Sequence, residues 1–102
     1  MFANLLKKLF GPGTDYRALV EKGAIIVDVR SPGEFKSGHL KGSLNVPLET
    51  VKQKAAELKK KNKPVITVCR SGNRSGMAKA ILAGNGIEVY NGGAWNSLQN
   101  KI

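Results

Sequence analysis

The sequence predicts an α/β fold in which a parallel sheet is flanked by helices on both faces. Apolar runs rich in β-branched residues alternate along the chain with segments in which apolar residues recur at helical spacing. This alternation implies crossover connections, which join parallel strands. The length of 102 residues is that of one domain, and neither internal repeats nor low-complexity segments divide it.

The first expected elements are a helix and a buried strand. Thr14 can cap a helix that begins at Asp15, and Gly23 is expected to end it. The apolar face of this helix is expected to consist of Tyr16, Leu19 and Val20. The next run, "AIIVDV" at 24–29, is almost continuously apolar, which indicates a strand buried on both faces of the sheet.

A loop, a short strand and a second helix are expected next. "RSPGEFKSGH" at 30–39 is predicted to be a loop because it contains a proline and two glycines. "SLNVP" at 43–47 is predicted to be a short strand that proline closes. Residues 48–61 are predicted to form a helix whose inward face consists of Leu48, Val51, Ala55 and Leu58.

The last third of the chain repeats the alternation. "PVITV" at 64–68 predicts a second buried strand, and a helix is expected after the loop that follows it. "GNG" at 84–86 is expected to end that helix. Its core contacts are expected to be Met77, Ala80, Ile81 and Leu82. "IEVY" at 87–90 predicts a last strand, and "NGGAW" at 91–95 is predicted to be the loop after it.

Residues 1–13 are expected to form an N-terminal tail or a short amphipathic helix. Apolar residues fall at helical spacing in this segment, at Phe2, Leu5, Leu6, Leu9 and Phe10. Lys7 and Lys8 interrupt the apolar stretch and "GPG" follows it, so no secretory signal is expected. We therefore expect the domain itself to comprise residues 14–102.

The formal net charge of +10 at pH 7 favours anionic ligands through long-range attraction. Nucleic acid is not an expected partner, because the densest lysine cluster, "KKKNK" at 59–63, has no aromatic residues interleaved with it. That cluster is expected to end a helix, where cations suit the negative end of the helix dipole. No apolar run is long enough to span a bilayer, so no stable membrane insertion is expected.

The single cysteine, Cys69, lies where an apolar run ends and the polar loop "RSGNR" at 70–74 begins. One cysteine cannot form an internal disulfide, and a free thiol suits a reducing compartment, so a cytoplasmic location is expected. Ligands of open parallel sheets bind outside the carboxyl ends of the strands. There the N–H groups of a curled loop can form an anion nest beside the positive N-terminus of the next helix. Arg70 and Arg74 add two charges, so a thiolate nucleophile is expected at Cys69 rather than an inert buried thiol.

Three kinds of cysteine enzyme fit this loop to different degrees. A thioredoxin-like oxidoreductase needs a second cysteine, and a cysteine protease needs a histidine base, for which His39 is the only candidate. A cysteine phosphatase has five residues between its cysteine and arginine, whereas four separate Cys69 from Arg74. The shorter ring is expected to enclose a smaller group, such as one additional sulfur atom.

Other polar residues are expected to be structural. His39 has no second histidine or cysteine nearby, so a hydrogen bond within its loop is expected and a metal site is not. Asp28 and Arg30 flank the end of a strand and are expected to pair with loop groups, of which Glu34 is a candidate. Trp95 is expected either to pack in the core or to form a wall of the pocket around the thiol.

Three segments together resemble the rhodanese sulfurtransferases. "VCRSGNRS" at 68–75 resembles that family's active loop, whose pattern is Cys-Arg-x-Gly-x-Arg or Thr. "IIVDVRSPGEFKSGHLKGSLNVPL" at 25–48 resembles its first signature, with the Asp-x-Arg, Glu-Phe, Gly-His and Gly-x-x-Asn-x-Pro positions. "GIEVYNGGAW" at 86–95 resembles its C-terminal stretch. The resemblance covers most of the chain, from about Thr14 onward.

The resemblance implies a rhodanese domain with a parallel sheet of about five strands. Because no clear strand precedes Asp15, the first edge strand is expected to be very short or absent. It also implies a monomeric thiosulfate sulfurtransferase that needs neither a metal nor an organic cofactor. In the implied cycle, Cys69 takes the outer sulfur of a donor such as thiosulfate. It then passes this sulfur from a persulfide to an acceptor, either cyanide or a thiol, including a protein thiol.

Carried over by position, Cys69 is the sulfur carrier. The cradle around it, built mainly of backbone N–H groups, is expected to consist of Arg70, Ser71, Gly72, Asn73, Arg74 and Ser75. Arg70 and Arg74 are the side chains best placed for a small anionic donor, with Arg74 directed across the mouth of the pocket. Structural support is expected from Asp28, Arg30, His39 and Trp95. The alternative function is a sulfur-carrying or docking module for a partner protein, with little turnover of its own.

Overall fold

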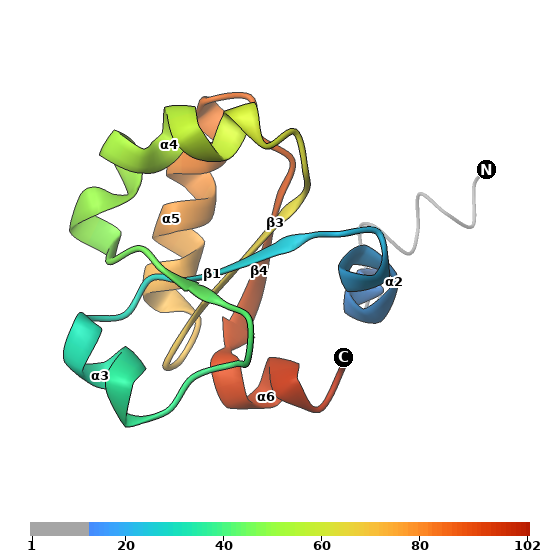
Figure 1. The fold of residues 1–102 in the computed structure, drawn as a ribbon, viewed down its shortest axis with the longest axis vertical. Coiled ribbons are helices and arrows are strands. Elements are labelled where there is room, and N and C mark those ends of the chain that lie inside the picture. The colour runs from blue at the N-terminus through green and yellow to red at the C-terminus, as the bar shows by residue number, and fades with distance from the viewer. Residues whose placement is uncertain (1–12) are drawn as a thin grey trace.

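A four-stranded parallel sheet organises residues 13–102, the part of the chain that the computed structural model describes (Figure 1). The strands lie in the order β2-β1-β3-β4, and their bounds are Ile25–Asp28 for β1, Leu44–Asn45 for β2, Val65–Cys69 for β3 and Val89–Ala94 for β4. The predicted α/β class and parallel sheet are confirmed. The predicted number of about five strands is wrong, because within these residues no strand precedes the first helix.

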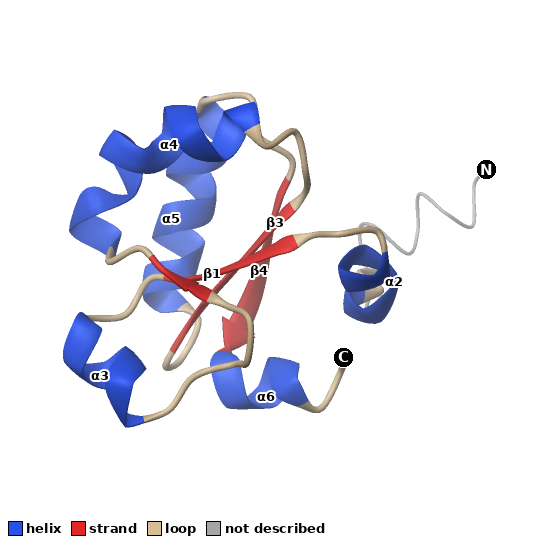
Figure 2. Ribbon diagram, viewed as in Figure 1, coloured by secondary structure: helices blue, strands red, loops and turns tan. Residues whose placement is uncertain are grey.

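Helices cover both faces of the sheet, as Figure 2 shows by colour. The bounds are Tyr16–Glu21 for α2, Pro32–Ser37 for α3, Val51–Lys60 for α4, Asn73–Gly84 for α5 and Trp95–Gln99 for α6, with a 3-10 turn, η1, at Leu48–Thr50. The expected tail or helix at 1–13 lies outside the described residues except for Gly13. Within the described part, no helix is both long and apolar enough to cross a membrane.

Two apolar clusters form the core, one on each face of the sheet. On the first face α4 and α5 pack against residues such as Val27 and Val65, and on the second α2 and α6 pack against Ile26 and Ile66. Successive side chains of a strand point to opposite faces. The continuous apolar runs therefore supply both clusters at once, which confirms the expected burial of β1 and β3 on both faces.

The first and second expected helices keep their predicted inward faces. Tyr16, Leu19 and Val20 pack against the second cluster, while Val51, Ala55 and Leu58 are buried and Leu48 packs beside them. The cap of α2 is Asp15 and not Thr14, because the Asp15 carboxylate accepts the Ala18 N–H at 3.0 Å. The lysine cluster at 59–63 does end a helix, since α4 stops at Lys60.

The segment predicted as a loop at 30–39 contains α3. Ser31 accepts the Glu34 N–H and the Glu34 carboxylate accepts the Ser31 N–H, which forms a capping box, and Pro32 occupies the first helical position. These start signals are present in the sequence. The helix has six residues and none of them is buried, so no apolar period shows its presence.

Two further differences arise near the C-terminal half. Met77 and Ala80 are exposed on α5, whereas Ser75, Ala78 and Leu82 face the core. The predicted loop "NGGAW" instead completes β4 and begins α6. A bulge makes this possible, because Thr67 pairs with Asn91 while the next residue, Val68, pairs with Gly93, two positions later. Gly92 is therefore the additional residue in the ladder.

Gly92 lies against β3 so closely that a side chain has no room. A Cβ atom there would lie 2.8 Å from Ile66 Cγ2 and 3.0 Å from the Thr67 carbonyl oxygen. We expect Gly92→Ala to lower the free energy of unfolding by about 1–3 kcal/mol, as overpacking typically does. Gly84→Ala is the matched control, because that position in α5 has open space. Urea denaturation of both variants measures the difference, and equal stabilities would contradict the packing.

Candidate active site

The thiol of Cys69 lies at the carboxyl edge of the sheet. Cys69 is the last residue of β3, and only 1% of it is exposed. The loop that follows runs directly into α5, and α3 and α6 lie at the same end of the sheet (Figure 1). This edge is where ligands bind in open parallel sheets. The structure thus places the predicted nucleophile at the predicted edge.

The loop after Cys69 turns so that backbone donors converge on its sulfur. The Gly72 N–H donates to Cys69 Sγ at 3.0 Å, and Ser75 Oγ lies 3.3 Å from the same sulfur. Gly72 has φ +103°, in the left-handed region that favours glycine. A Cβ at Gly72 would also lie 3.5 Å from the Gly93 Cα of β4. Two residues of the predicted cradle at 70–75, Gly72 and Ser75, thus contact the sulfur directly.

The surroundings of Cys69 favour the thiolate form. Burial raises the pKa of the thiol, but hydrogen bonds from the Ser75 side chain and from the N–H groups of Ser75, Gly72 and Ser71 outweigh it, so that the pKa of Cys69 is lowered. The N-terminus of α5 begins at Asn73 and adds positive potential beside the sulfur. A thiolate held in this way is the reactive form of cysteine.

The second arginine of the loop, Arg74, is paired with a carboxylate and is not a free cation. Arg74 Nη1 and Nη2 donate to the two carboxylate oxygens of Glu34 in α3, at 2.7 and 3.0 Å. The guanidinium holds the pKa of Glu34 at about 2, and the carboxylate raises the pKa of Arg74. Arg70, in contrast, is exposed and forms no ion pair with any residue of 13–102. Arg70 is thus the uncompensated cation of the cradle.

Three of the four expected supporting residues come together beside α3. Arg30 donates from Nη2 and Nε to the buried carboxylate of Asp28, at 2.6 and 2.9 Å, and the Trp95 ring lies 4.9 Å from the guanidinium carbon. Arg30 also donates to the carbonyl oxygens of Glu34, within α3, and of Gly38, directly after it. This buried pair fixes the position of α3, and through it the position of Glu34. Trp95 packs in the second cluster and covers this pair.

The fourth expected supporting residue, His39, contacts Phe35 of its own segment. Its Nδ1 is 2.7 Å from the Phe35 carbonyl oxygen, and its ring stacks on Phe35 with centroids 3.7 Å apart. The predicted hydrogen bond within its own segment is confirmed. Within the described residues, no group of three or more His, Cys, Asp or Glu side chains could hold a metal ion.

Asn91 of β4 was not predicted as a site residue, and it holds the cradle from the side opposite Glu34. Its Oδ1 accepts the Ser75 hydroxyl at 2.7 Å and the Gly93 N–H at 3.0 Å, and its Nδ2 donates to the Gly72 carbonyl at 3.1 Å. Nothing in the sequence marks this asparagine except its place in the "NGG" bulge, because its partners belong to another strand and a loop.

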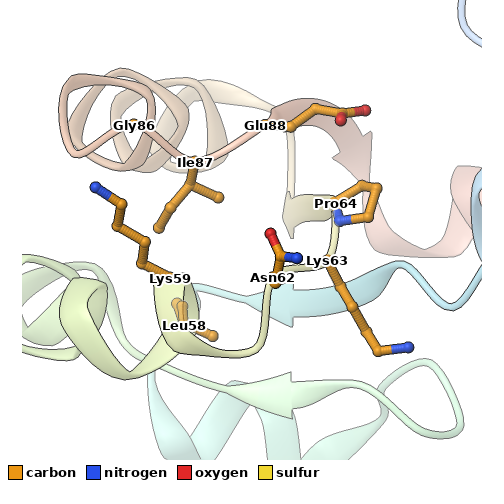
Figure 3. A pocket seen from close by; sticks show the side chains of 8 residues that line it. All are labelled: Leu58, Lys59, Asn62, Lys63, Pro64, Gly86, Ile87 and Glu88. Carbon is orange, nitrogen blue, oxygen red and sulfur yellow. The ribbon is translucent and has the colours of Figure 1, made fainter.

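A surface pocket also lies at the opposite, amino-terminal edge of the sheet (Figure 3). Its lining residues are Leu58, Lys59, Asn62, Lys63, Pro64, Gly86, Ile87 and Glu88. Lys59 Nζ lies 3.2 Å from where a Gly86 Cβ would be, just beyond the end of α5, and Lys63 Nζ approaches Gly23 in the same way beyond α2. Cations at the C-terminal ends of helices stabilise those ends. These lysines therefore have a structural role far from Cys69.

Residues 13–99 match the rhodanese-like domain family. The uncharacterized protein YqhL of Bacillus subtilis is 42% identical over 78 residues, which make up 76% of this chain and 60% of YqhL, so the chain spans less than two thirds of that relative. The thiosulfate sulfurtransferase GlpE of Pseudomonas syringae is 38% identical over 82 residues, or 78% of this chain and 74% of GlpE. A rhodanese with anions from Escherichia coli has a solved structure with a TM-score of 0.66 and 36% identity, which covers 72% of this chain and 89% of that one.

The charge balance around Glu34 and Arg74 leads to a prediction about the thiol. We expect Glu34→Gln to lower the pKa of Cys69 and Arg74→Ala to raise it, each by up to about one unit, because they leave an unpaired cation and an unpaired carboxylate nearby. In the wild type, with which both variants are compared, the pair stays ionised throughout the measurement, since the pKa of Glu34 is about 2.

The rate of alkylation by iodoacetamide against pH measures both shifts. Glu57→Gln removes an exposed carboxylate from α4 and serves as the control, with no shift expected. A general loosening of the loop would move both variants in the same direction. Shifts of the same sign in Glu34→Gln and Arg74→Ala would therefore contradict the electrostatic role.

Proposed function

The chain belongs to the rhodanese-like domain family, and we propose that it is a thiosulfate sulfurtransferase that works through a persulfide on Cys69. The observation that carries the proposal is the cradle of hydrogen-bond donors around the sulfur of the only cysteine. The relatives named thiosulfate sulfurtransferase support the choice of reaction. Residues 14–102 would form the catalytic domain, and 1–13 a separate segment.

The first half of the cycle loads the cysteine with sulfur. The Cys69 thiolate attacks the outer sulfur of thiosulfate, and a bond forms between Sγ and that sulfur. The sulfur–sulfur bond of the donor breaks, and its electron pair leaves with sulfite. The outer sulfur of the persulfide then carries the negative charge, which the positive potential at the N-terminus of α5 favours.

The second half returns the enzyme to its starting state. A nucleophilic acceptor, such as cyanide or a thiolate, attacks the outer sulfur. The bond between the two sulfurs breaks, and its electron pair returns to Cys69 Sγ, which leaves as a thiolate. The lowering of the pKa of Cys69 therefore helps both halves, because it favours the attacking thiolate and makes the same sulfur a better leaving group. The two steps balance without a metal or an organic cofactor.

Charge supports a small anionic donor. The net charge of +10 and the free, exposed guanidinium of Arg70 attract a dianion such as thiosulfate. Arg74 contributes less than expected from the sequence, because Glu34 compensates its charge. The acceptor is a thiol, either of a small molecule or of a protein. We also propose that the chain acts as a monomer in the cytoplasm, where the free Cys69 stays reduced.

Thiosulfate:cyanide turnover by purified protein tests the proposal. We expect the wild type to form thiocyanate, and Cys69→Ser to lose on the order of 10³-fold or more of this activity while it remains folded. Met77→Leu removes an exposed sulfur-containing side chain from α5 and should keep full activity. Turnover near the wild-type rate in Cys69→Ser would contradict the assignment. A wild type that takes up sulfur but does not turn over would point to a sulfur-carrying module for a partner protein.

A further inference from the structure

We propose that Asn91 is a positioning residue that acts through the Ser75 hydroxyl to adjust how strongly the Cys69 sulfur is stabilised as its charge changes. The catalytic role of this arrangement rests on the proposed sulfur transfer, whereas the hydrogen bonds that form it do not. Ser75 Oγ lies between two acceptors, Asn91 Oδ1 at 2.7 Å and Cys69 Sγ at 3.3 Å. A hydroxyl has one proton, so it can donate to only one of them at a time.

Because the Ser75 hydroxyl is buried, it must donate to one of these two atoms and not to water. Ser75 is fully buried and Cys69 is 1% exposed, so the hydroxyl is shielded from solvent and must use the partners around it. When Cys69 is a thiol, its S–H can donate to Ser75 Oγ while Ser75 donates to Asn91. When Cys69 is a thiolate, it has no proton to give, and the Ser75 hydroxyl can rotate to donate to Sγ instead.

Asn91 can release the hydroxyl without leaving a buried group unpaired. Its Oδ1 keeps the Gly93 N–H at 3.0 Å after Ser75 turns away. Its Nδ2 donates to the Gly72 carbonyl at 3.1 Å throughout. The amide orientation is defined by these contacts, because two donors face Oδ1 and one acceptor faces Nδ2. Asn91 is thus a competing acceptor that never becomes an unsatisfied one.

The backbone holds Asn91 in this position. It pairs with Thr67 of β3 at the residue before the bulge, and its carbonyl accepts the Tyr16 hydroxyl of α2 at 2.9 Å. Thr67 Oγ1 in turn donates to the Ser75 carbonyl at 2.9 Å. Contacts with β3 and α2 therefore hold Asn91 in place, and the bond from Thr67 holds Ser75 of α5 beside it.

The rotation matches the chemistry of the second half of the cycle. In the persulfide, the inner sulfur is bonded to the outer one and carries no charge, so Ser75 can donate to Asn91. When the acceptor takes the outer sulfur, the electron pair of the broken bond moves to Sγ. Ser75 can then donate its hydrogen bond to the departing thiolate. No proton is transferred in this exchange; one hydrogen bond changes its acceptor.

We call the effect of Asn91 on Cys69 through the Ser75 hydroxyl the relay. A double-mutant cycle on the pKa of Cys69 tests it. Asn91→Leu removes the competing acceptor. It should therefore lower the pKa of Cys69 more when Ser75 is present than when Ser75 is replaced by alanine. The expected difference between the two backgrounds is up to about one pH unit, the equivalent of one neutral hydrogen bond. Iodoacetamide alkylation against pH measures it in all four proteins. The readout needs no turnover, so failure of the relay and failure of the sulfurtransferase proposal are seen separately.

A purely structural role for Asn91 predicts the same shift whether or not Ser75 is present. The relay would be overturned if Asn91→Leu changed the pKa of Cys69 equally in the two backgrounds, or if it raised that pKa more when Ser75 is present. If Asn91→Leu does not fold, Asn91→Asp replaces it, since the carboxylate keeps both oxygen contacts. Aspartate should hold the hydroxyl more firmly and raise the pKa of Cys69 more with Ser75 present than in Ser75→Ala. An equal or smaller rise would overturn the relay as well.

The kinetic part of the proposal has its own measurement. Persulfide-loaded protein is mixed with cyanide, and thiocyanate is followed over a single turnover. We expect Ser75→Ala to slow this step by about 10-fold, because the departing thiolate loses one hydrogen bond to a charged group. An unchanged rate would overturn the role of Ser75 in the second half of the cycle.

Discussion

The tight turn after Cys69 is the constraint on which the rest of the site depends. The chain must leave β3 and enter α5 within a few residues, and it must do so with its N–H groups directed at one sulfur. Gly72 provides the left-handed backbone of this turn, and Gly93 of β4 lies close beneath it. The bulge at Gly92 brings β4 into that position. Backbone geometry in two neighbouring strands therefore sets the chemistry of one thiol.

Side chains from three elements then hold the turn in place. Glu34 of α3 binds Arg74 on one side of the loop, and Asn91 of β4 holds it on the other. The pair of Asp28 and Arg30 fixes α3 in turn, since Arg30 donates to the carbonyl groups of Glu34 in α3 and of Gly38 directly after it. The positive charge of Arg74 is neutralised by Glu34, so it holds the loop against α3 and attracts an anion less strongly. In the proposed reaction, the donor would be bound by the backbone N–H groups of the loop and by Arg70, which has no ion pair among residues 13–102.

Much of this arrangement could be predicted from the sequence, for identifiable reasons. Strands β1 and β3 are continuous apolar runs because both of their faces are buried, and Cys69 stands out because glycine and cationic residues follow such a run. The pairing of Glu34 with Arg74 could not be predicted, because 40 positions separate them and only the fold brings them together. Asn91 was missed for the same reason. The family resemblance implied about five strands, but residues 13–102 form four, because no edge strand precedes α2 in them.

The central claim is that Cys69 itself carries the transferred sulfur, and the mass of the loaded protein tests this most directly. Purified protein is incubated with thiosulfate without an acceptor, separated from excess donor, and measured intact and after proteolysis. We expect the protein to be heavier by one sulfur atom, located on the peptide that contains Cys69 and lost on addition of cyanide. An unchanged mass, or additional sulfur on any other peptide, would contradict a Cys69 persulfide.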